Sequence, residues 1–170
     1  MLESGVFADE SSSKQTIGRI AAPPGYFPPS MKVFLSYAHE DAEWADSIRE
    51  ALRYSKGSDQ FEVWNPKLEI QPGENWAKKI GEALESSDAL VVLLSPRSVN
   101  SPNVRQEIDF ALTQPKFKDR LISVMVKPTS GVPWILRSLP FIDGTRSKQQ
   151  AGRAVAAALT AALEKQTAKQ

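Results

Sequence analysis

The 170-residue sequence contains no cysteine and only one histidine, His39. The absence of cysteine excludes disulfide bonds, thiolate metal sites and cysteine nucleophiles. A single histidine excludes a multi-histidine metal site, and a Ser-His-Asp hydrolase would have to use His39. We therefore expect no metal centre in this protein.

Long apolar runs and an excess of one charge are also missing. No run approaches the roughly 20 apolar residues that span a bilayer, and the N-terminus lacks the pattern of a secretory signal. The 21 Lys and Arg residues nearly balance the 20 Asp and Glu residues, for a net charge of +1. This balance gives no support for a nucleic-acid or membrane-surface binder. We expect a cytoplasmic protein with neither kind of partner.

The chain divides into three segments. Residues 1–30 are rich in serine and proline and show no sustained hydrophobic period, which predicts a flexible N-terminal arm. Residues 31–165 form one patterned domain, and residues 166–170 are expected to fray. A domain of this length can bury a single core without disulfide or metal support.

Within the domain, apolar runs alternate with amphipathic stretches. The runs predict strands at 33–35, 61–64, 89–94, 121–126 and 139–142. Helical spacing predicts helices at 44–52, 76–84, 101–112 and 154–163, with Trp44 and Leu112 among the core residues. Ser101 would cap the third helix, and Pro102 would take its first position. Residues 65–75 are interpreted as a polar connection, and residues 131–138 as a loop or short helix.

Strand–helix alternation predicts an α/β fold with a parallel sheet covered on both faces, in the flavodoxin-like order 2-1-3-4-5. Ligands of such folds bind beyond the carboxyl ends of the strands, near the point where the strand order reverses. The chain has neither GxGxxG nor GxxxxGK[ST], which disfavours an NTPase or a dinucleotide dehydrogenase. The central strand ends in Leu94-Ser95 rather than in aspartate, which excludes a phosphorylated receiver domain.

Glu107 is the most unusual polar residue of the pattern. Helical geometry places it at the edge of the apolar stripe, with Val104 and Ala111 on one side and Asn103 and Phe110 on the other. A half-enclosed carboxyl has a raised pKa unless a partner stabilises its charge, and active sites provide such environments. The alternatives are an ion pair with a basic loop residue or a side chain whose end reaches water.

Two tryptophans flank the polar connection at the same edge of the sheet. Trp64 and Trp76 could each stack on a ring of a ligand, although core packing is at least as good an interpretation of Trp76, which also begins an amphipathic stripe. His39 follows the first strand at this edge and is a further candidate for contact with a substrate.

Four ordered motifs, FLSYAHED at 34–41, PGENW at 72–76, ALVVLLSP at 89–96 and SPNVRQEI at 101–108, resemble a Toll/interleukin-1 receptor (TIR) domain. The resemblance is greatest to the bacterial branch and covers about residues 31–165. Many bacterial, plant and neuronal members cleave NAD between nicotinamide and ribose, giving ADP-ribose or a cyclic or rearranged ADP-ribose signal. The family's catalytic glutamate lies in a Ser-x-Trp-x-x-x-Glu pattern, which assigns that role to Glu107. Asn103 replaces the tryptophan and leaves the linear or cyclic product open, and Asn65 stands where many relatives carry aspartate.

The resemblance implies a site without metal or cofactor, in which NAD is the substrate. Its substrate-binding residues would be Phe34, Ser36, Tyr37, Trp64, Asn65, Trp76, Ser95 and Asn103. It also implies a role in bacterial anti-phage defence, self-association through TIR–TIR contacts or filaments, and an activating or downstream effector protein. A non-catalytic TIR interaction module that uses residues 65–75 is the main alternative. A nucleoside deoxyribosyltransferase-like hydrolase shares the topology but matches the motifs less well.

Overall fold

A computed structural model describes residues 30–55 and 60–169, and its central feature is a five-stranded sheet. The strands are β1 (Met31–Ser36), β2 (Phe61–Trp64), β3 (Ala89–Leu94), β4 (Leu121–Met125) and β5 (Phe141–Asp143). All neighbouring strands are parallel, and their order is β2-β1-β3-β4-β5. This arrangement confirms the predicted flavodoxin-like fold. Apart from Ser30, the predicted N-terminal arm lies outside the described residues.

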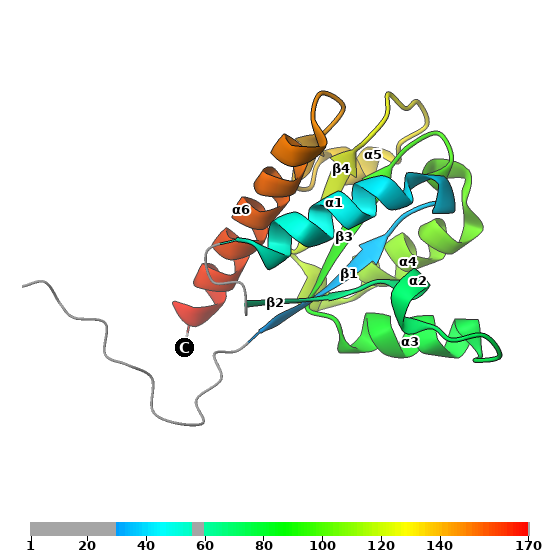
Figure 1. Ribbon diagram of the computed structural model, residues 1–170. Coiled ribbons are helices and arrows are strands. Elements are labelled where there is room, and N and C mark those ends of the chain that lie inside the picture. Colours follow the sequence, from blue (N-terminus) through cyan, green and yellow to red (C-terminus); the bar gives the residue numbers. More distant parts are fainter. Residues whose placement is uncertain (1–29, 56–59, 170) are drawn as a thin grey trace, which may run out of the picture.

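Helices cover both faces of the sheet (Figure 1). The α-helices are α1 (Ala42–Arg53), α2 (Pro66–Glu69), α3 (Trp76–Ser86), α4 (Pro102–Thr113), α5 (Trp134–Arg137) and α6 (Lys148–Thr167). Single 3-10 turns occur at η1 (His39–Asp41), η3 (Ser98–Asn100) and η4 (Pro115–Phe117). Helices α1 and α6 pack on one face, and α3, α4 and α5 pack on the other. Within the described residues, no helix is both long enough and apolar enough to span a membrane.

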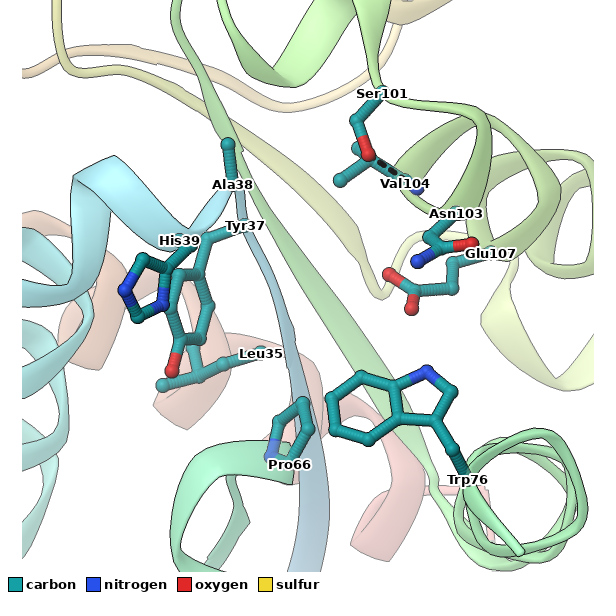
Figure 2. A pocket seen from close by; sticks show the side chains of 10 residues that line it. All are labelled: Leu35, Tyr37, Ala38, His39, Pro66, Trp76, Ser101, Asn103, Val104 and Glu107. Carbon is teal, nitrogen blue, oxygen red and sulfur yellow. Dashed lines mark hydrogen bonds between the residues drawn. The ribbon is translucent and has the colours of Figure 1, made fainter.

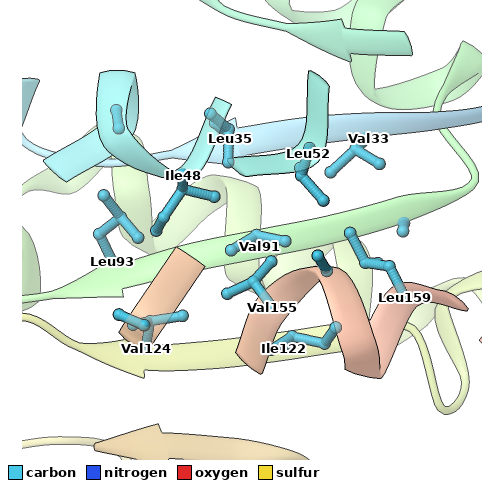
Figure 3. Packing of buried hydrophobic residues seen from close by; sticks show 14 of the residues in the cluster. Val33, Leu35, Ile48, Leu52, Val91, Leu93, Ile122, Val124, Val155 and Leu159 are labelled. Carbon is cyan, nitrogen blue, oxygen red and sulfur yellow. The ribbon is translucent and has the colours of Figure 1, made fainter. Parts of the chain in front are cut away.

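The first core lies between the sheet and helices α1 and α6 (Figure 3). Val33 and Leu35 of β1 point into it, because alternate residues of a strand face the same side. The two helices approach each other closely at Gly152, where an added Cβ atom would lie only 2.6 Å from the Cβ atom of Ala51. A side chain at this position is therefore incompatible with the observed packing.

The second core lies under α3 and α4 and receives the other side of β1, namely Phe34 and Ser36. Strand β3 is buried along its whole length, as its continuous apolar run predicts. The alternation along β1 has a functional consequence, because it turns the hydroxyl of Ser36 toward α4 rather than toward α1.

Several element boundaries differ from the sequence predictions. The polar connection contains α2, and the segment 131–138 contains α5. Helix α6 begins six residues earlier than predicted, because Ser147 caps it by accepting a hydrogen bond from the backbone N–H of Gln150. The helix ends at Thr167, so the first two residues of the predicted frayed tail are helical. The core assignment of Leu112 was wrong, since the side chain is 40% exposed.

The fifth strand is also displaced, to Phe141–Asp143 instead of 139–142. Pro140 has no N–H group to donate, although its carbonyl accepts a hydrogen bond of 2.9 Å from the N–H of Ser123, and the pairing with β4 begins at Phe141. By contrast, Trp44 lies where the helical pattern places it, partly buried against the first core.

Candidate functional site

The carboxyl ends of β1 and β2 and the first turns of α3 and α4 surround a cavity of about 280 Å³ (Figure 2). Parallel strands bring their carboxyl ends to one edge, so this position is the one that the fold class predicts. The first cavity is lined by Leu35, Tyr37, Ala38, His39, Pro66, Trp76, Ser101, Asn103, Val104 and Glu107. Four of these, Tyr37, Trp76, Asn103 and Glu107, are predicted site residues, and His39 is the further candidate.

Local sequence sets the position of Glu107 on α4. The helix begins at Pro102, and the Ser101 side chain accepts a hydrogen bond from the N–H of Val104. Both features confirm the predicted start of the helix. Val104, Ile108 and Ala111 form its buried stripe, and Glu107 is turned inward beside them.

Glu107 is a buried acidic group with only 6% of its surface exposed. The Ser36 Oγ donates a hydrogen bond of 2.5 Å to Glu107 Oε2. Among the Lys, Arg and His side chains that the structure describes, which do not include Lys67, none forms an ion pair with this carboxyl. The described side chains therefore offer Glu107 no cationic partner, and its low exposure does not support a side chain whose end reaches water. Burial raises its pKa from the ordinary 4.5 to about 7, although the hydrogen bond from Ser36 acts in the opposite direction.

A second cavity of about 270 Å³ lies between α3 and α4 and adjoins the first. Trp76, Asn103 and Glu107 line both cavities. The remaining wall of the second cavity is largely apolar and consists of Ala77, Ile80, Gly81, Leu84, Gln106 and Phe110. The indole of Trp76 is 47% exposed, so its ring is accessible at the junction of the two cavities. The carboxyl of Glu107 is thus flanked by a more polar cavity and a more apolar one.

Tyr37 and Asn65 support the wall of the first cavity. The Tyr37 hydroxyl donates a hydrogen bond of 2.7 Å to Asn65 Oδ1, which joins the segment after β1 to the segment after β2. Burial raises the pKa of Tyr37, so this phenol stays protonated and keeps donating at neutral pH. Asn65 is buried behind the tyrosine and does not itself line either cavity.

Four other predicted substrate-binding residues lie away from the cavity surface. Phe34 and Trp64 stack on each other, with ring centroids 4.9 Å apart and an angle of 20° between the planes. Trp64 thus packs against the second core, whereas the half-exposed Trp76 keeps a free face. Ser36 is buried against Glu107, and Ser95 is fully buried in a separate polar cluster.

This polar cluster is a feature that sequence reasoning missed. Asp41 is fully buried, accepts a hydrogen bond from the Ser95 hydroxyl and forms an ion pair of 2.8 Å with Lys127 Nζ. The cluster ties together the segments that follow β1, β3 and β4. Each of the three residues follows a predicted strand at the same sheet edge, which is the signal that could have identified it.

Among the described residues, the site contains one carboxyl with an elevated pKa, aromatic and amide side chains, and no cationic group paired with that carboxyl. Within the described part of the chain, His, Asp and Glu side chains form no group of three suited to a metal ion. Such an arrangement can bind a flat ring beside Trp76 and stabilise positive charge beside Glu107.

Comparisons with known proteins agree with this architecture. The family model for the TIR domain matches residues 33–165. The TIR domain of the Toll-related receptor TRR-2 from Hydra magnipapillata superimposes with a TM-score of 0.55 and 22% identity, covering 65% of this chain and 82% of that chain. A prokaryotic SEFIR domain gives a TM-score of 0.54 and 14% identity, covering 72% of this chain and 87% of that chain. No curated protein sequence matches the chain. Since the family match spans most of its length, this chain belongs to the TIR domain family.

Proposed function

We propose that this TIR domain is a NAD glycohydrolase that cleaves the bond between nicotinamide and ribose. The observation that carries the proposal is the position of Glu107, a buried carboxyl between two adjoining cavities, without a cationic partner in the described part of the chain. A carboxyl with a pKa near 7 ionises readily when positive charge develops beside it. Each cavity is close to the lower end of the size range of small-molecule sites, so each fits part of a dinucleotide.

In this reaction the bond between ribose C1′ and the pyridinium nitrogen breaks, and its electron pair neutralises that nitrogen. Positive charge then develops on the ribose, as in glycoside hydrolysis. The Glu107 carboxylate, which is itself largely buried, stabilises this charge at short range. Nicotinamide leaves as a neutral molecule and needs no proton, so one carboxylate suffices. Attack by water with loss of a proton gives ADP-ribose, whereas attack by a nitrogen of the adenine gives a cyclic product.

The half-exposed Trp76 supports the assignment of a ring-bearing substrate. Its indole is accessible where the two cavities meet, and stacking on an aromatic side chain is worth about 1–3 kcal/mol per base. Asn103 lines the same junction with an amide, which can both donate and accept hydrogen bonds. An amide of this kind is complementary to the carboxamide of nicotinamide.

The test is NAD consumption by concentrated wild-type protein beside Glu107→Gln, with the products separated by chromatography. Loss of the carboxylate should slow release of nicotinamide at least about 100-fold. Asp109→Asn is the matched control, because it removes the same charge from an exposed position of α4 and should retain activity. Absence of turnover in the wild type, even under crowding or induced assembly, would refute the proposal. The same chromatograms distinguish the linear from the cyclic product.

TIR domains commonly associate with one another, and two exposed apolar side chains favour such contacts here. Leu68 of the 65–75 segment is 52% exposed, and Trp134 of α5 is 78% exposed. We propose that self-association activates cleavage, so specific activity should rise with protein concentration. Equal specific activity over a wide range of concentrations would contradict this part of the proposal.

A non-catalytic TIR interaction module is the second candidate, favoured by the same exposed side chains. Glu107→Gln separates the two functions, because full biological activity of this variant would exclude the enzyme. We extend the enzyme proposal to bacterial anti-phage defence, where depletion of NAD would stop the infected cell. Phage plating on cells that express the wild type or Glu107→Gln tests this role, and equal protection by both proteins would contradict it.

A further inference from the structure

The geometry points to Ser36 as a positioning residue that holds one oxygen of Glu107 and leaves the other oxygen for the substrate. Ser36 ends β1 on the face that meets α4, and only 1% of its surface is exposed. It does not line either cavity, so it is placed to act on the carboxyl rather than on a ligand. This inference deepens the proposed function and gives Ser36 a role different from the substrate contact that its motif implied.

The contact between the two side chains is specific in its geometry. The hydroxyl donates to Oε2 at 2.5 Å, and both groups are buried. Among the described side chains, which do not include that of Lys67, none donates a hydrogen bond to the other oxygen, Oε1. Figure 2 shows the carboxyl of Glu107 extending from α4 into the space between Trp76 and the segment of Tyr37 and Ala38. The hydrogen bond to Oε2 restricts the rotation of the carboxyl and leaves Oε1 available to a ligand in that space.

The same hydrogen bond favours the charged form of Glu107. The hydroxyl donates to the carboxylate, which partly offsets the cost of burying the charge. Without the Ser36 hydroxyl, only the effect of burial on the pKa of Glu107 would remain, and the carboxyl would be protonated over more of the neutral pH range. A protonated carboxyl cannot stabilise a cationic ribose, so Ser36 would set the lower pH limit of the reaction.

The experiment compares the wild type with Ser36→Ala and with Ser123→Ala as a matched control. Ser123 is also fully buried and lies in the same row of the sheet, since Ser36 pairs with Val92 and Val92 pairs with Ser123. Its hydroxyl has no hydrogen-bond partner within the described residues, so its removal controls for the loss of a buried hydroxyl from the sheet. The carboxyl resonance of Glu107 is followed by carbon-13 NMR over pH, with Glu107→Gln used to identify it.

We expect Ser36→Ala to raise the pKa of Glu107 by about one unit, a tenfold change in proton affinity. Ser123→Ala should leave this pKa unchanged. In NAD cleavage, kcat of Ser36→Ala should fall about fivefold near pH 7, as the ionised fraction of Glu107 falls, and recover at higher pH, with KM unchanged. A merely structural role would instead lower kcat equally at every pH.

Two results would overturn the inference: an unchanged pKa of Glu107 in Ser36→Ala, or a raised KM with an unchanged kcat. The second result would mean that the hydroxyl contacts the substrate. The NMR titration needs no turnover, so it separates this inference from the proposed function. Cleavage that requires Glu107 but does not depend on Ser36 would refute the inference alone.

Discussion

Replacement of Glu107 by glutamine should stabilise the protein at alkaline pH while it removes the proposed activity. The wild-type carboxyl has its pKa raised from 4.5 to about 7 by burial. The native state therefore favours the protonated carboxyl, and this contribution is fully present below pH 4.5. It is lost as the pH rises through about 7, because the native state must then bury a charge that water solvates in the unfolded chain.

The magnitude follows from the difference between the two pKa values. A difference of about 2.5 units corresponds to about 3 kcal/mol of unfolding free energy above pH 8. The introduced glutamine would carry no charge at any pH, and its carbonyl can still accept the hydrogen bond from Ser36. About 3 kcal/mol is an upper bound, since the glutamine N–H groups also lose contact with water. At 2–4 °C per kcal/mol, the melting temperature should rise by at most roughly 6–12 °C.

The assay is thermal and urea unfolding of the wild type, Glu107→Gln and Asp109→Asn at pH 4 and pH 8. Glu107→Gln should unfold like the wild type at pH 4 and later than the wild type at pH 8. Asp109 is exposed, so its variant should show no such pH-dependent gain. The reasoning is refuted if Glu107→Gln gains nothing at pH 8, or if its difference from the wild type is the same at both pH values.

Three further substitutions test other parts of the structure. Gly152→Ala places a Cβ atom 2.6 Å from that of Ala51, so α1 and α6 must move apart. The free energy of unfolding in urea should fall by about 1–3 kcal/mol, and an unchanged midpoint would contradict this packing. Trp76→Ala should raise the KM for NAD at least about tenfold, because the stacking contact is lost. The melting temperature should change little, because Trp76 is 47% exposed, and an unchanged KM would exclude the stacking role. Asp41→Asn removes the ion pair with Lys127 and should cost about 1–3 kcal/mol in thermal unfolding, whereas equal stability would show that the cluster contributes nothing.

The predicted strands and helices that proved correct depend on local signals. The apolar run of β3 is typical of a buried strand in a sheet covered on both faces, and the structure places it at the centre. Ser101 and Pro102 predict the start of α4 because capping involves only neighbouring residues. Glu107 could likewise be placed beside the buried stripe of α4, since the helical period fixes its neighbours on the helix.

The two tryptophans show where local signals fail. Trp64 and Trp76 flank the same connection, and the helical spacing that begins at Trp76 favours core packing for the wrong one of the two. Only packing decides that Trp64 lies against Phe34 while Trp76 keeps an exposed face at the cavities. The start of α6 was missed for a related reason, because its first turns lack the apolar stripe and depend on the Ser147 cap.

The sequence by itself therefore determined the strand and helix types, the parallel sheet, and the sheet edge that carries the candidate site and the candidate carboxyl. These properties follow from period, capping and the direction of parallel strands, which involve residues close together in the chain. The tertiary structure alone decided which groups meet at that edge. Ser36 contacts Glu107 across 71 positions and Lys127 contacts Asp41 across 86, distances over which no local pattern specifies a partner. Such contacts depend on how whole helices and strands pack, and that packing sets the charge and orientation of Glu107.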